Sequence, residues 1–72
     1  MNKLSHFRKQ QNIAQPVLGA LLVPPIKQAA VSMHERGERT PDVYQAIQYA
    51  RALGVSVEEL FPLTDVHESQ AA

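Results

Sequence analysis

Prolines and glycines divide this 72-residue chain into short segments, and that division limits the fold more than any other feature. A proline ring clashes with a continuing helix, so Pro24-Pro25 and Pro62 each end the segment before them. Gly37 and Gly54 follow apolar patterns of helical period, at positions where a left-handed residue ends a helix. No segment shows the period-two alternation of a strand. The sequence therefore predicts an all-α protein, a compact bundle of five short helices.

Capping signals set the predicted helix boundaries. Asn2 is the predicted N-cap of the first helix, and Thr40 that of the fourth, with Pro41 at its first position. Ser56 and Glu59 have the spacing of a capping box, which starts the fifth helix. The predicted helices cover residues 3–10, 14–22, 26–35, 41–53 and 57–61.

The composition excludes several classes of protein. The absence of cysteine excludes a disulfide-stapled scaffold and a thiolate metal site. The apolar residues, 44% of the chain, form no run of the roughly 20 residues that a membrane helix needs. The first eight residues lack the apolar stretch and cleavage site of a secretory signal. We therefore expect a cytoplasmic protein with no membrane partner.

No catalytic or metal site is expected. His6, His34 and His67 share no helical spacing, and no carboxylate pair joins them. Neither the alternation of Ser32 with His34 nor the adjacent Glu58-Glu59 places a base beside a nucleophile. The chain is also small for a substrate pocket. The sequence predicts neither an enzyme nor a cofactor.

The net charge is zero, but the two halves of the chain differ in sign. Residues 1–39 carry six basic and two acidic side chains, for a net charge of +4. Residues 40–72 carry one basic and five acidic side chains, for a net charge of −4. A basic half of this kind suits phosphates, and the alternative interpretation is two solvated surfaces of opposite sign.

Two predicted helices, within residues 12–22 and 26–37, are separated by a short proline-marked turn. Leu18 and Leu22 in the first and Ile26 and Val31 in the second have the spacing of facing apolar stripes. Two such helices joined by a turn describe a helix-turn-helix, whose second helix presents its polar face to the DNA major groove.

Two motifs strengthen this interpretation. Glu-Arg-Gly-Glu-Arg-Thr-Pro occupies residues 35–41, and Ala-Leu-Gly-Val-Ser occupies residues 52–56. With Ile13-Ala14-Gln15 opening the first helix of the pair, the chain resembles Cro and phage-repressor helix-turn-helix proteins over about residues 4–61. The resemblance implies a lambda-repressor-like DNA-binding domain over residues 1–62, followed by a polar tail over residues 63–72.

The chain departs from this family at two places. Family members usually have one glycine between the two helices, whereas this chain has Val23-Pro24-Pro25, about two residues more. The longer turn can shift the recognition helix along its axis, so the register of base contacts stays open. Gly19 replaces a common alanine and lowers helix propensity by up to about 1 kcal/mol, although close helix packing also requires a small residue there.

The resemblance also implies roles for individual residues. Gln28 stands where the family often reads a base, and glutamine bonds bidentately to adenine. Gln15 stands where the family's residue bonds a phosphate and braces that glutamine. Arg8 and Glu35 are expected to form a structural ion pair, and for the exposed residues the alternative is an ordinary solvated side chain. The implied base-reading residues are Gln28, Ala29, Ser32 and Met33, and the implied phosphate contacts are Gln15, Lys27, Arg36 and Arg39.

The predicted function is a sequence-specific transcriptional repressor of the Cro type, associated with the nucleoid, that binds a palindromic double-stranded DNA operator as a homodimer. Leu60, Phe61 and Leu63 supply more apolar side chains than the edge of so small a core needs, so we expect them at the dimer interface. Two alternatives stay open: an antitoxin whose tail or apolar face neutralises a toxin, and a protein-interaction adaptor. The sequence leaves a phage, prophage or plasmid origin open.

Overall fold

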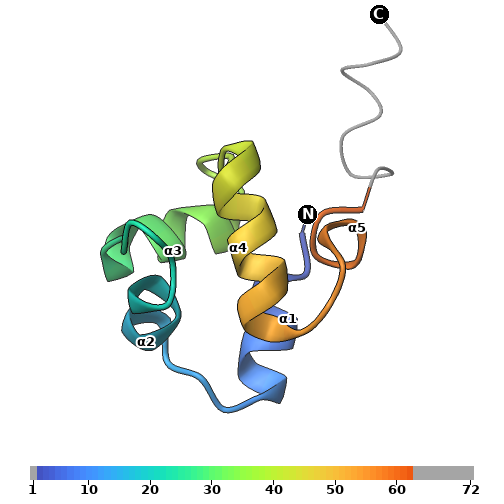
Figure 1. Cartoon of the computed structure of the whole chain (residues 1–72), viewed down its shortest axis with the longest axis horizontal. Coiled ribbons are helices and arrows are strands. Elements are labelled where there is room, and N and C mark those ends of the chain that lie inside the picture. The colour runs from blue at the N-terminus through green and yellow to red at the C-terminus, as the bar shows by residue number, and fades with distance from the viewer. Residues whose placement is uncertain (1, 63–72) are drawn as a thin grey trace, which may run out of the picture.

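A computed structural model describes residues 2–62 and contains five α-helices and no strand over that range. This confirms the predicted all-α bundle (Figure 1). The C-terminal tail, with Leu63 and His67, lies outside the described residues. No helix within residues 2–62 has the length and apolar character needed to cross a bilayer. The helices are α1 Leu4–Gln10, α2 Gln15–Ala20, α3 Gln28–Arg36, α4 Val43–Leu53 and α5 Val57–Leu60.

Side-chain and backbone caps fix the helix ends. The Asn2 side chain accepts a hydrogen bond from the backbone N–H of Leu4 at 3.0 Å, although the N-cap position itself belongs to Lys3. The predicted N-cap at Thr40 is wrong, because Asp42 caps α4 in a capping box with Gln45. The predicted capping box of α5 is confirmed.

The core lies where α1, α2 and α3 meet α4 and α5. Tyr49 is its largest fully buried side chain and comes from the middle of α4, which runs between α3 and α5 (Figure 1). The buried apolar residues of this core are Leu4, Leu18, Leu22, Val31, Tyr49, Ala50, Leu53 and Leu60.

The expectation that Leu60 contributes to a dimer interface is wrong. Its side chain is fully buried, because α5 folds back on the core and seals it from the C-terminal side. The Leu60 carbonyl also accepts a hydrogen bond from the backbone N–H of Lys3 at 2.8 Å, which joins α5 to the start of the chain. Phe61 is only half-buried against the same core.

The turn between α2 and α3 is longer than predicted at both ends. α2 ends at Ala20, and α3 begins at Gln28. The turn folds closely against α2, because the Gly19 carbonyl accepts a hydrogen bond from the Ile26 N–H at 3.0 Å. A Cβ atom on Gly19 would lie 2.4 Å from the Ile26 carbonyl oxygen. The glycine is therefore required by the backbone of the turn as well as by helix packing.

Candidate nucleic-acid interface

α3 separates its side chains into a buried face and an outward face. Val31 and His34 are buried, while Lys27, Gln28 and Ala29 at the start of the helix are exposed. The remaining outward residues follow toward the C-terminal end, with Ser32 and Met33 half-buried and Arg36 exposed. A helix that is anchored on one side and polar at its exposed start has the form that enters a major groove.

A chain of polar contacts runs from α1 to the exposed start of α3. Arg8 and Glu35 form a two-pronged ion pair, with N–O distances of 2.5 and 3.2 Å. Both side chains are nearly buried, at 10% and 7% exposure. Gln15 Nε2 donates to Glu35 Oε1 at 2.9 Å, and Gln28 Nε2 donates to Gln15 Oε1 at 3.2 Å. The structure thus brings together four residues from the sequence analysis: Arg8, Glu35, Gln15 and Gln28.

This series of polar contacts fixes the orientation of the side-chain amides of Gln15 and Gln28. The Glu35 carboxylate accepts hydrogen bonds only, so the amide group of Gln15 must face it with its nitrogen. The oxygen of Gln15 then faces Gln28 and takes one of its two N–H groups. Gln28 keeps its carbonyl oxygen and its second N–H for another partner. One acceptor beside one donor is the pattern that reads the N6 and N7 edge of adenine.

Arg8 also shapes the entry to α2. Its Nη1 donates to the Ile13 carbonyl at 2.7 Å, just before the helix begins. Asn12 precedes this point with a left-handed backbone, at φ 59°, and turns the chain out of α1. The guanidinium therefore connects the end of α1, the entry to α2 and the last turn of α3.

Arg36 is engaged within the protein. Its guanidinium donates to Glu38 at 2.7 and 3.1 Å, and also to the Ser32 hydroxyl. Hydrogen bonding to Arg36 lowers the pKa of the Glu38 carboxyl, and the same bond raises the pKa of Arg36. The sequence analysis did not identify Glu38, although its position two residues after Arg36 was the available signal. These bonds use three of the five N–H groups of Arg36, so a phosphate contact can use the other two or displace Glu38.

Lys27 and Arg39 lie at the two ends of α3 and are exposed. Neither side chain forms an ion pair or a hydrogen bond within residues 2–62. Arg39 is placed by its backbone, whose N–H donates to the Met33 carbonyl at 3.3 Å. These two cations flank the exposed face of the helix.

His34 and Tyr49 form the buried support beneath α3. The His34 Nδ1 and the Tyr49 hydroxyl are 2.7 Å apart, and the two rings meet edge to face. Burial lowers the pKa of His34, with a further lowering from the charge of Arg39. The His34 carbonyl accepts a hydrogen bond from Asn2 Nδ2 at 2.7 Å. Over residues 2–62 no three metal-ligating side chains gather into a candidate metal site.

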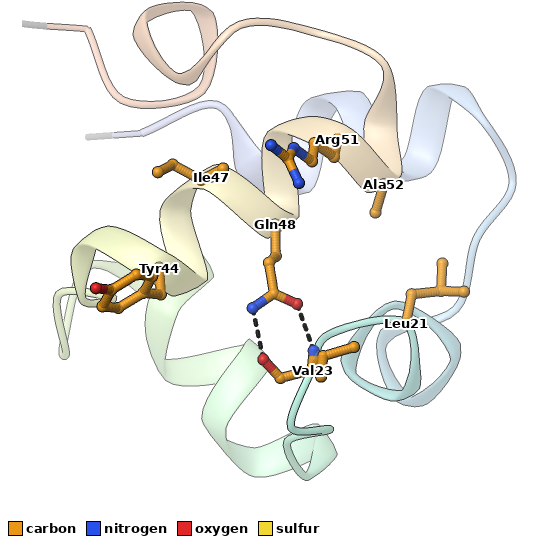
Figure 2. A pocket seen from close by; sticks show the side chains of 7 residues that line it. All are labelled: Leu21, Val23, Tyr44, Ile47, Gln48, Arg51 and Ala52. Carbon is orange, nitrogen blue, oxygen red and sulfur yellow. Dashed lines mark hydrogen bonds between the residues drawn. The ribbon is translucent and has the colours of Figure 1, made fainter.

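Gln48 supports the candidate interface from behind, and the sequence did not predict its role. Gln48 extends from α4 toward the turn that precedes α3, and its side-chain amide bonds both backbone groups of Val23 (Figure 2). The Gln48 Nε2 donates to the Val23 carbonyl at 2.6 Å, while its Oε1 accepts from the Val23 N–H. Gln45 and Arg51 are also polar residues of α4, so no local signal distinguished Gln48 from them.

The sequence comparisons agree with this geometry. The helix-turn-helix family model matches residues 4–60, a range that contains all five helices and the polar contacts from Arg8 to Gln28. No curated protein and no solved structure gave a match. The chain belongs to the helix-turn-helix family of the Cro and repressor type, and it is a DNA-binding regulator.

Proposed function

We propose that this regulator is a sequence-specific transcriptional repressor that binds a palindromic operator as a homodimer. The observation that carries the proposal is the bracing of Gln28, whose free acceptor and donor are held at the exposed start of α3. A fixed side chain loses less conformational freedom on binding than a mobile one. Base reading is assigned to Gln28, Ala29, Ser32 and Met33.

Phosphate contacts are assigned to the polar residues around this face. Lys27 and Arg39 are exposed at its two ends and are not paired within residues 2–62. Gln15 keeps one N–H after its bond to Glu35, which suits a phosphate oxygen. Arg36 joins them through its two remaining N–H groups or by displacing Glu38.

A homodimer follows from the size of the reading surface. One recognition helix covers too few base pairs to be selective, whereas two half-sites one helical turn apart suffice. The proposed dimer surface centres on half-buried Phe61, next to Val57, which is 38% exposed, and Val43, which is 71% exposed. These three side chains line one groove, together with Pro62. Leu63 is proposed to extend this surface.

Selection of bound sites from a random DNA pool tests the proposal directly. We expect the wild-type chain to enrich a two-fold symmetric sequence, with half-site centres about 10 base pairs apart. When the operator overlaps a promoter, binding is expected to block polymerase and lower the expression of a reporter gene. The protein is expected to reside on the nucleoid. If no sequence is enriched and the chain binds every DNA sequence with equal affinity, the proposal is contradicted.

The role of Gln28 is tested with Gln28→Ala. The variant is expected to lose about 1–3 kcal/mol of discrimination at one base position, while its affinity for random DNA stays nearly unchanged. Gln10→Ala is the matched control, because Gln10 is exposed on α1 and forms no side-chain hydrogen bond within residues 2–62. An equal loss on every sequence would show that Gln28 does not read a base.

An antitoxin is the second proposal, and a specific surface favours it. Four exposed or half-exposed apolar side chains gather beside α4, from the turn before α3 and from α4 itself (Figure 2). Exposed apolar groups gathered in this way mark protein-binding surfaces. Copurification with a toxin encoded beside this chain, abolished by Tyr44→Ala, would support the antitoxin. The side chains are Leu21, Val23, Tyr44 and Ile47.

A further inference from the structure

Residues 23–25, in the middle of the turn between α2 and α3, are exposed and have little that attaches them to the helices. Pro24 and Pro25 carry no backbone N–H, so Val23 has the only backbone donor over residues 23–25. The Val23 side chain is 74% exposed and contributes little packing. Hydrogen bonds to Val23 therefore add to the packing of Leu22, which is 1% exposed, in fixing the path of the turn.

Gln48 supplies those contacts from α4. Its side-chain amide donates to the Val23 carbonyl at 2.6 Å and accepts from the Val23 N–H, so both backbone polar groups are satisfied by one side chain (Figure 2). Because the Gln48 amide pairs with Val23 through two hydrogen bonds, it fixes both the position and the orientation of the Val23 backbone. α4 itself is anchored in the core through Tyr49 and Leu53, which are fully buried or nearly so.

Gly19 holds the other end of the same turn. Its carbonyl accepts the Ile26 N–H at 3.0 Å, and the Ile26 carbonyl lies where a side chain on residue 19 would be. The turn is thus held at Ile26 by α2 and at Val23 by α4. Residue 27 follows directly as the N-cap of α3, so the turn determines where the recognition helix begins.

We propose that Gln48 is a positioning residue for DNA recognition: by holding Val23 it sets the place of α3 against the base pairs, although it touches no DNA. The inference rests on the proposed sequence-specific function. The longer turn has to be held in one conformation if Gln28 is to meet the same base in every complex. Loss of the contact then broadens the sequence preference and leaves the phosphate contacts in place.

The test compares wild type, Gln48→Ala and Gln48→Glu. A glutamate accepts from the Val23 N–H but opposes the Val23 carbonyl, so it keeps one of the two bonds. For Gln48→Ala we expect the ratio of affinities for the selected site and a scrambled site to fall about tenfold, as for one lost base contact. For Gln48→Glu we expect a smaller fall. Affinity for the scrambled site should change less than about twofold.

Hydrogen exchange at the Val23 amide gives an independent readout. We expect slow exchange in the wild type and exchange at least about tenfold faster in Gln48→Ala, because a hydrogen bond slows exchange by limiting local opening. Gln10→Ala should match the wild type in both measurements. A merely structural role would move the unfolding midpoint without changing the ratio of affinities.

The outcomes separate this inference from the function on which it rests. If wild type itself prefers no sequence, the proposed function fails. If wild type is selective and Gln48→Ala is folded and equally selective, the positioning role is refuted. If both Gln48 variants are unfolded even at low temperature, the positioning role is also refuted, since Gln48 would then contribute to stability in general.

Discussion

Gly19 is the residue where the helix and the following turn come closest. Helix propensity alone favours Gly19→Ala by about 1 kcal/mol. The added Cβ would instead lie 2.4 Å from the Ile26 carbonyl oxygen and 3.1 Å from the Val31 side chain. We expect the substitution to lower the free energy of unfolding by about 1–3 kcal/mol, as overpacking does. Urea unfolding measures this, and a variant as stable as wild type would show that the turn moves freely.

Glu38 restrains Arg36, one of the proposed phosphate contacts. Glu38→Gln removes the carboxylate that holds Arg36 and also removes one negative charge beside α3. We expect affinity for random DNA to rise about tenfold and the dependence of affinity on salt to steepen, because more cations contact phosphate. Glu58→Gln is the matched control, since it removes the same charge from α5. A rise of equal size in both variants would indicate net charge alone.

His34 couples stability to pH. Burial, followed by the charge of Arg39, lowers the pKa of His34 below its ordinary value of 6.5, while Asp42 opposes the shift. Below about pH 6.5, the unfolded chain binds more protons at this residue than the native protein does. Stability is therefore full above pH 6.5 and falls as the pH drops from there toward the lowered value. Thermal melts between about pH 5 and 8 measure this, and His34→Phe should flatten the slope.

At the scale of the elements, α5 depends on its cap. The helix has four residues, too few to be stable without its capping box and the burial of Leu60. Ser56→Ala removes the acceptor for the Glu59 N–H and is expected to cost about 1 kcal/mol. Ser56→Asp keeps an acceptor and should retain most of the stability. Equal unfolding free energies for wild type and Ser56→Ala would contradict this role.

The sequence predicted the helices well because their signals are local. Capping residues, glycines and apolar spacing act within a few positions of one another, as at Ser56 and Gly37. Thr40 and Asp42 both precede α4, and the capping box with Gln45 identifies Asp42 as the cap. Relations between distant residues were harder to predict. Nothing local connects Gln48 with Val23.

In the candidate site, long-range contacts could be predicted only where the family resemblance implied them. The contacts of Arg8 with Glu35 and of Gln15 with Gln28 could be expected, because a family resemblance carries long-range pairing with it. The bond between Gln15 and Glu35 was not expected. The burial of Leu60 could not, because an apolar residue near a chain end is equally compatible with a core and with an interface.

At the scale of the whole molecule, two apolar surfaces are proposed to bind partners, one lined by Phe61 and the other by Tyr44. Phe61→Ala is expected to weaken self-association and operator binding together, since it removes apolar surface from the groove that Phe61 lines with Val57 and Val43. Analytical ultracentrifugation and a gel-shift titration measure the two effects, with circular dichroism to check folding. Tyr44→Ala, on the other surface, should leave both unchanged. A wild-type chain that binds its operator as a monomer at micromolar concentration would refute the dimer.

The polar chain from Arg8 to Gln28 gives α1 an influence on recognition that its position does not suggest. If Arg8 is replaced, Glu35 still accepts from Gln15 but loses the ion pair that holds its carboxylate in place. The Gln15 amide, and with it Gln28, is then held less firmly in its orientation. Altered operator preference can therefore arise from a helix far from any base. A survey of variants with changed specificity that sequenced α3 alone would overlook this source.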